Sequence, residues 1–220
     1  MLDGHEIPAA SRTLRDHWRA GTKLAGLDPA MRPRDRIEGY AIQAEIERPS
    51  SGKLFGWKIG ATSEAGQRHI NVAGPMAGRI LPETVIADGG IASMAGNDMR
   101  VAEPEFAFRM RTDLPPRASP YGVSEVLEAV DTLHPAIEIP DSRFADFAGP
   151  ARRSSLPTMP ARICSCSVRR RTRTGARSIL SNSARWSNCA AVNMSAMART
   201  CSATPAWRWR GSSTNCALLA

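Results

Sequence analysis

The stretch RVAEPEFAF, residues 100–108, is the part of the sequence that most decides its predicted fold. Its residues alternate as in a β-strand, where side chains at positions i and i+2 point to the same face. Glu103 and Glu105 are therefore expected side by side, with Phe106 and Phe108 turned toward a core. Neighbouring carboxylates repel unless a cation or a shared proton offsets their charge. The stretch predicts either an oxygen-rich site suited to Mg²⁺ or Mn²⁺, or the solvated face of an edge strand that tolerates a proline.

The segments around this strand do not follow a regular βαβ order. Apolar spacing and Gly or Pro breaks predict helices over 10–21, 32–49 and 119–134 and short strands within 50–63, 84–87, 99–110 and 135–144. The apolar faces of the second and third helices are predicted at Ile37, Tyr40, Ala41 and Ala44, and at Val126, Leu127 and Val130. This order predicts an α+β or mixed-β enzyme domain.

A third carboxylate, Glu138, lies between two isoleucines in the segment PAIEIPDSRF, residues 135–144. It is interpreted either as a third metal ligand or as the polar face of a half-buried strand. In the turn that follows, Asp141 and Arg143 are most simply a local ion pair, although an arginine there is also suited to bind a substrate carboxylate.

Lys58 lies in an apolar run, GWKIG, where flanking glycines allow another backbone or a ligand to come close. A partly desolvated lysine has a lowered pKa and can transfer protons. Alternatively, its aliphatic stem packs on apolar surface while the ammonium reaches water.

The composition changes sharply near residue 150. Residues 1–150 carry all 21 acidic residues and a net charge of −4, whereas residues 151–220 carry 12 arginines, no acid and all five cysteines. We therefore expect a domain over 1–150 and a separate segment over 151–220. No apolar run has the roughly 18–20 residues that span a bilayer, and no signal sequence is evident at the N-terminus, so a cytoplasmic location without membrane partners is expected.

Together, GWKIGATSEAGQ, GPMAGRIL, RVAEPEFAF and LHPAIEIPDSRFADF resemble the 2-keto-4-pentenoate hydratase branch of the fumarylacetoacetate hydrolase superfamily. The resemblance covers about residues 10–148. It implies that Glu103, Glu105 and Glu138 hold a divalent metal, Mg²⁺ or Mn²⁺, and that Lys58 lies at the active site, with Arg143 a candidate for substrate binding. It also implies a mixed β-roll or β-sandwich with peripheral helices in a homo-oligomer.

The chemistry implied by the resemblance is addition of water to 2-hydroxypenta-2,4-dienoate-type acids in aromatic catabolism. A metal chelated by the 1-carboxylate and 2-oxo group of a 2-keto acid stabilises enolate charge as a Lewis acid, while Lys58 or a metal-held water moves protons. Sister enzymes with the same ligands act as 2-oxo acid decarboxylases of the 4-oxalocrotonate type or as C–C hydrolases. These reactions are the alternatives within the superfamily.

The segment 151–220 has three competing interpretations. Arginine clusters and tryptophans suggest a basic nucleic-acid-binding arm, and a C-x-C pair suggests a weak metal site. The third interpretation is a displaced reading frame. If each codon begins on the third base of the codon above it, Met159-Pro160 forces Ala, and the surrounding residues permit the family-like strand AQLIADNA…HLFVLGAP.

The same frame permits a family-like C-terminal block, VLGDPRVALAWLVNEL, from residues after Met197. We therefore interpret 151–220 as an out-of-frame, irregular segment rather than a nucleic-acid partner site. Because a Ser- and Arg-rich segment cannot supply the apolar faces of the missing strands, this chain is expected to have an incomplete C-terminal core and impaired or no activity. A non-catalytic basic binding protein is the alternative from another functional class.

Overall fold

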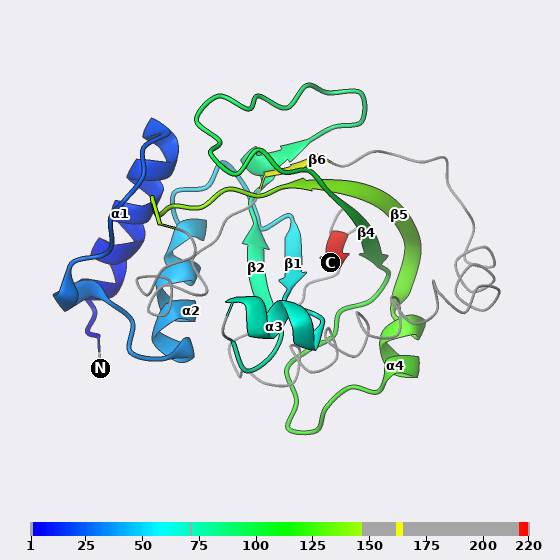
Figure 1. Ribbon diagram of the computed structural model, residues 1–220. Helices are drawn as coiled ribbons and strands as arrows, with labels where there is room; N and C mark the ends of the chain where they lie inside the picture. Colours follow the sequence, from blue (N-terminus) through cyan, green and yellow to red (C-terminus); the bar gives the residue numbers. More distant parts are fainter. Residues whose placement is uncertain (1, 71, 147–161, 165–215, 220) are drawn as a thin grey trace. The chain divides into compact units, whose positions relative to one another are not determined.

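The computed structural model describes residues 2–70, 72–146, 162–164 and 216–219, and it is an α+β structure (Figure 1). Its helices are α1 (Glu6–Ala20), α2 (Arg36–Ala44), α3 (Glu64–Ile70) and α4 (Val123–Glu128). Its strands are β1 (Gly56–Gly60), β2 (Met76–Ile80), β3 (Val85–Ile86), β4 (Glu103–Met110), β5 (Val130–Ile139), β6 (Arg162–Cys164) and β7 (Cys216–Leu219). Short 3-10 helices lie at Pro29–Met31, Glu45–Glu47 and Pro82–Thr84.

Strand β4 lies in the interior of a sheet. The strand order is β2-β1-β7-β4-β5-β6-β3, so β4 has a hydrogen-bonded neighbour on each side. β7 pairs in parallel with β1 and antiparallel with β4, and β4 and β5 curve side by side in Figure 1. The alternative that placed Glu103 and Glu105 on an edge strand is therefore wrong.

The chain divides into two compact units, and the division passes through β4 and β5. One unit holds the described residues up to Leu54, Gly78–Glu103 and the described residues from Glu138 to Cys164; the other holds Phe55–Ala77, Pro104–Ile137 and β7. Each unit buries apolar side chains of its own.

In the first unit, α1 and α2 lie against each other (Figure 1). The core cluster contains Leu2, Ala10, Leu14, Leu27, Ile42 and Phe144. Gly21 ends α1 as predicted, with the left-handed φ of 66° that glycine adopts without steric cost. Just beyond it, Leu24 N–H donates to the Arg143 carbonyl at 2.8 Å, and Ala145 N–H donates to the Leu24 carbonyl at 2.8 Å. The segment after β5 is thereby fixed beside the end of α1.

The second unit is built on β1, β4 and β5. Phe108 is 2% exposed and packs as the alternation of β4 predicts, with its neighbour Ala107 buried on the opposite face. Val126 of α4 is fully buried. Arg117 and Glu125 form an ion pair at 2.7 Å that fixes the start of α4.

Two predicted elements differ from the structure. In α2 the predicted apolar face is wrong, because Ile37 is exposed while Glu38 is buried and accepts hydrogen bonds from the backbone N–H groups of Leu2 and Arg34, each at 2.8 Å. The helix predicted over 119–134 ends at Glu128, and β5 begins at Val130. The segment from Val130 contains Val, Thr and Ile, which favour strands, and it pairs with β4. This pairing forms although the local spacing of apolar residues predicted a helix.

The strands β6 and β7 lie in the segment 151–220, whose remaining residues are outside those described. We predicted that this segment is irregular, out of frame and a separate domain. These predictions fall mostly on residues outside those described, and they stay predictions. Among the described helices, each is too short or too polar to cross a membrane.

Candidate metal centre

Three carboxylates converge where β4 and β5 run beside each other. Glu103, Glu105 and Glu138 each offer an oxygen atom, and the three oxygens lie within 4.8 Å of one another. Two of the residues come from one strand at positions i and i+2, as the sequence predicts, and the third comes from the neighbouring strand. The pairing of the strands therefore brings together the carboxylates that the sequence separates by more than thirty residues.

The cluster is largely shielded from water. Glu138 is 2% exposed and Glu105 is 6% exposed, while Glu103 is partly buried. Next to Glu138, Ile137 is 37% exposed, so the acidic side chain is the one turned inward. Of the two interpretations of Glu138, the structure excludes the polar outer face of a half-buried strand.

This geometry suits a small divalent cation. Burying several carboxylates is costly unless a positive charge compensates them. Oxygen ligands at about 2.1 Å from an octahedral ion lie roughly 3 to 4 Å from one another, and the three oxygens here all lie within 4.8 Å of one another. Hard carboxylate oxygens without sulfur or imidazole are the donor set for Mg²⁺ or Mn²⁺.

Lys58 lies in β1, and the sheet register determines which way its side chain points. Lys58 pairs with Leu218 of β7, and Leu218 also pairs with Ala107 of β4. Paired residues on adjacent strands project to the same face, and Ala107 shares that face with Glu105 two residues before it. The register therefore places the half-buried Lys58 on the same face as Glu105.

Two polar residues of β5, Thr132 and His134, are not among the predicted site residues. His134 is half-buried in β5, and burial together with the positive charge of Arg109 lowers the pKa of its imidazole. Its Nε2 lies 2.7 Å from the Thr132 hydroxyl. His134 and Glu138 are four residues apart, so in a strand their side chains share one face. The sequence did not indicate this, because residues 119–134 were predicted to form a helix.

The expected ion pair between Asp141 and Arg143 does not form. Asp141 instead pairs with Lys23, whose ammonium also donates to the Ser142 carbonyl at 2.8 Å. Arg143 is 3% exposed, and its guanidinium lies 5.2 Å from the centroid of the Trp18 ring. Asp141 thus pairs with a lysine that is distant in the sequence, and not with the arginine two residues after it.

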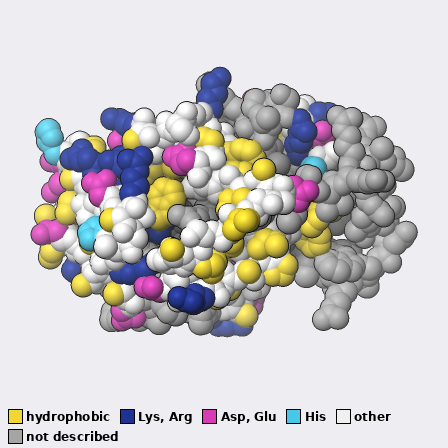
Figure 2. Space-filling view, turned by 90° about the horizontal axis from the view of Figure 1, so that it is seen from above, with side chains coloured by type: hydrophobic (Ala, Val, Ile, Leu, Met, Phe, Trp, Pro, Cys, Tyr) yellow, Lys and Arg dark blue, Asp and Glu magenta, His cyan; other side chains and the backbone are white. Residues whose placement is uncertain are grey.

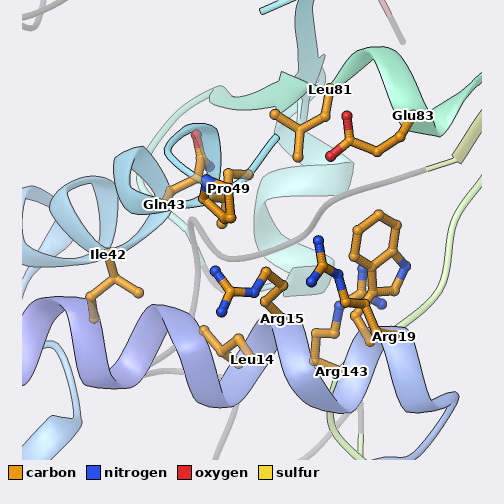
Figure 3. A pocket seen from close by; sticks show the side chains of 11 residues that line it. Leu14, Arg15, Arg19, Ile42, Gln43, Pro49, Leu81, Glu83 and Arg143 are labelled. Atoms are coloured by element: carbon orange, nitrogen blue, oxygen red, sulfur yellow. The ribbon is translucent and has the colours of Figure 1, made fainter. Parts of the chain in front are cut away.

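Arg143 also lines two hollows in the first unit. One, of about 20 Å³, lies between α1 and the segment that carries Leu81 and Glu83; Figure 3 shows Arg15, Arg19 and Arg143 grouped below Glu83. The other has a volume of about 350 Å³ and is bordered by the end of α1, residues 93–97 and residues 139–143. None of the three clustered glutamates lines either hollow.

No known family model matches the chain. Several bacterial enzymes are similar to the chain in sequence. A 2-keto-4-pentenoate hydratase from Burkholderia vietnamiensis is 27% identical over 150 residues, which cover 67% of this chain and 56% of the hydratase. A 2-hydroxyhexa-2,4-dienoate hydratase from Comamonas testosteroni is 30% identical over 152 residues, covering 67% and 57%. A 4-oxalocrotonate decarboxylase from a Pseudomonas species is 31% identical over 130 residues, covering 59% and 49%.

The fold has counterparts among solved structures. The 4-oxalocrotonate decarboxylase from Pseudomonas putida G7, complexed with magnesium and adipate, superposes with a TM-score of 0.64 and 20% sequence identity over 75% of this chain and 64% of the decarboxylase. The same enzyme complexed with calcium and acetate gives a TM-score of 0.62 with 21% identity. The chain spans about half the length of the curated relatives that it matches.

Proposed function

We infer that this chain, a relative of the 2-keto-4-pentenoate hydratases and 4-oxalocrotonate decarboxylases, belongs to a divalent-metal enzyme that adds water to 2-hydroxypenta-2,4-dienoate-type acids. The observation that carries the proposal is the convergence of three buried or partly buried carboxylates within 4.8 Å. Because the chain spans about half of its relatives, the complete reaction is proposed for the whole protein.

Glu103, Glu105 and Glu138 would hold the cation, Mg²⁺ or Mn²⁺. When bound, such an ion acts as a Lewis acid toward the 1-carboxylate and 2-oxo group of the substrate and stabilises enolate charge. The ligands themselves fix where the substrate lies, since two of them share one strand and the third is held by the adjacent strand. Their burial keeps bulk water from competing for the site.

Lys58 is the proposed proton-transfer residue. The register that sets it on the face of Glu105 supports this role, because a proton donor must reach the carbon skeleton of a substrate held by the carboxylate cluster. Its neighbours Trp57, which is 4% exposed, and Ile59 are buried on the opposite face of β1 and anchor the strand, while Lys58 is half-buried on the face of Glu105. A lysine on this face can donate a proton to the substrate and accept it back.

Arg143 is proposed to bind a carboxylate. Its guanidinium is buried beside Trp18 and lines a hollow large enough for a small molecule. A planar guanidinium can bind a carboxylate with two parallel hydrogen bonds.

The proposed architecture is the mixed β-roll with peripheral helices of the fumarylacetoacetate hydrolase superfamily, assembled as a homo-oligomer. Likeness of fold to the P. putida decarboxylase supports it. That likeness, together with 31% identity to a second decarboxylase, also favours a competing reaction: decarboxylation of a 4-oxalocrotonate-type 2-oxo acid with the same ligands. C–C bond hydrolysis is the third reaction available to this ligand set.

One assay distinguishes hydration from decarboxylation. Protein expressed from a frame-restored gene is incubated with Mg²⁺ or Mn²⁺, separately with 2-hydroxypenta-2,4-dienoate and with 4-oxalocrotonate. Products are followed by NMR and by release of CO₂. We expect 4-hydroxy-2-keto acid from the dienoate, and no product after the metal is removed. Release of CO₂ as the faster reaction would favour the decarboxylase instead. Undiminished turnover in metal-free protein would reject the metal-centred function.

A further inference from the structure

The larger hollow of the first unit is a second place where the chain could hold a small molecule. Its volume of about 350 Å³ lies in the range of ligand pockets, roughly 300–1,000 Å³. The neighbouring hollow of about 20 Å³ has room for about one water molecule. Trp18, Arg19 and Arg143 line both hollows, so these three side chains form the wall that separates them.

The cavity wall carries a net positive charge, which bears on the kind of ligand it can bind. Arg19, Lys23 and Arg143 line it together with one carboxylate, Asp141, which gives a net charge of +2 with His17 neutral. Lys23 and Asp141 form an ion pair with each other, and the wall also carries Arg19 and Arg143. A site with this wall favours an anion. Figure 2 shows Lys and Arg side chains gathered toward the left of the view, the side on which α1 lies in Figure 1.

The end of α1 does not oppose an anion as strongly as an open helix C-terminus would. Free carbonyl groups at such an end carry a partial negative charge. Here the Thr22 N–H donates to the His17 carbonyl at 3.0 Å, and the Gly21 N–H donates to the Trp18 carbonyl at 3.3 Å. Two of the last four carbonyls of α1 therefore already accept backbone hydrogen bonds, which weakens their repulsion of an anion.

The rest of the wall is apolar or aromatic. Trp18, Ala20, Ala95 and Ile139 contribute carbon surface, and Ile139 is 7% exposed. Bare inorganic ions gain nothing from such surface, whereas a ligand with a carbon body removes apolar area from water. Arg143 supplies the fork-shaped donor for the head group, and it is itself 3% exposed.

We propose that this cavity binds a small organic anion, with a carboxylate or phosphate head on Arg143 and Arg19 and a carbon body against Trp18 and Ile139; this rests on the carboxylate-binding role proposed above for Arg143. The site does not depend on the proposed metal chemistry, because none of Glu103, Glu105 and Glu138 lines it.

The test uses the full chain after removal of metal ions on a chelating resin. Benzoate, phenyl phosphate and inorganic phosphate are titrated separately by isothermal calorimetry. At least one of the two aromatic anions is expected to bind at least five-fold more tightly than inorganic phosphate. The tighter of benzoate and phenyl phosphate identifies the head group. Equal affinity for inorganic phosphate, or no binding of either aromatic anion, would overturn the proposal.

Substitutions inside and outside the cavity lining test whether the anion binds in this cavity. Arg19→Gln should weaken binding several-fold, while Arg12→Gln, the matched exposed arginine of α1 outside the cavity lining, should leave it unchanged. Arg143→Met should weaken binding ten-fold or more. Ala20→Leu, at an exposed position on the cavity wall, should block binding without disturbing the core.

Thermal unfolding of each variant shows whether it is folded. If Arg143→Met fails to fold, Arg19→Gln and Ala20→Leu still decide the question. Equal losses in Arg12→Gln and Arg19→Gln would mean general charge attraction and would reject the site. A Glu105→Gln variant should bind the anion normally, and loss of binding there would place the anion at the carboxylate cluster instead.

Discussion

Lys58 and Glu105 project from the same face of the sheet, because Lys58 and Ala107 pair with the same residue of β7, Leu218. Two strand spacings of about 4.8 Å separate β1 from β4. An ammonium group and a carboxylate that share a face across this span can act on one substrate lying between them. The relationship links the candidate proton-transfer residue to the candidate metal ligands without any nearness in sequence.

Loss of one clustered carboxylate should weaken metal binding. Glu105→Gln and Glu138→Gln each remove a charged oxygen from a site whose three oxygens lie within 4.8 Å of one another. We expect the Kd for Mn²⁺, measured by electron paramagnetic resonance, to rise at least ten-fold. Glu128→Gln, an exposed glutamate at the end of α4, serves as the matched control and should leave the Kd unchanged. Unaltered affinity in both cluster variants would remove the metal assignment.

Replacing Lys58 should separate proton transfer from metal binding. In protein expressed from a frame-restored gene, Lys58→Met is expected to reduce turnover of 2-hydroxypenta-2,4-dienoate by about 10²- to 10⁴-fold. Mn²⁺ affinity should persist, because the ligands are untouched. Lys53→Met, five residues earlier and exposed, is the control and should keep full turnover. Wild-type rates and an unchanged pH profile in Lys58→Met would show that Lys58 has only a packing role.

The ion pair at the start of α4 should make stability depend on pH. The Arg117 guanidinium and the Gly122 N–H lower the pKa of the Glu125 carboxyl to about 2. A carboxyl with a depressed pKa in the folded state stabilises the fold above its unfolded pKa, near 4.3, and this contribution is lost as pH falls toward 2. Glu125→Gln should therefore lower the unfolding midpoint at pH 7.

The difference between wild type and Glu125→Gln should narrow between about pH 4 and pH 2. Circular dichroism melts at several pH values measure it, with Glu128→Gln as control. A difference that stays constant down to pH 2 would mean that the glutamine acts by altered packing and not through the charge.

The coding DNA tests the interpretation of residues 151–220. We predict a one-base displacement near codons 148–153, and correcting it should restore the permitted blocks AQLIADNA and VLGDPRVALAWLVNEL. The restored protein should melt cooperatively and gain metal-dependent turnover. An intact reading frame, together with an RNA complex that weakens steeply with salt and is lost when the arginines of 169–173 become glutamines, would favour the basic binding protein instead.

Some local features of this protein follow from sequence alone. Alternation in a strand places Glu103 and Glu105 on one face, and Gly21 ends α1 because only glycine adopts its φ of 66° without cost. The change of composition near residue 150 is equally visible in the sequence. Family-like motifs also indicated Glu138 and Lys58 as members of one site, although their positions in space were not derivable from spacing.

Tertiary structure decided the rest, because the deciding contacts join residues far apart in the chain. Pairing of β4 with β5 brought Glu138 to within 4.8 Å of the other two carboxylates and buried it. Asp141 forms an ion pair with Lys23, which is more than a hundred residues away, and not with the expected partner Arg143. Arg143 in turn came to line a cavity with the end of α1. Local periodicity carries no information about such long-range hydrogen bonds, ion pairs and strand registers, which form only when the whole chain packs.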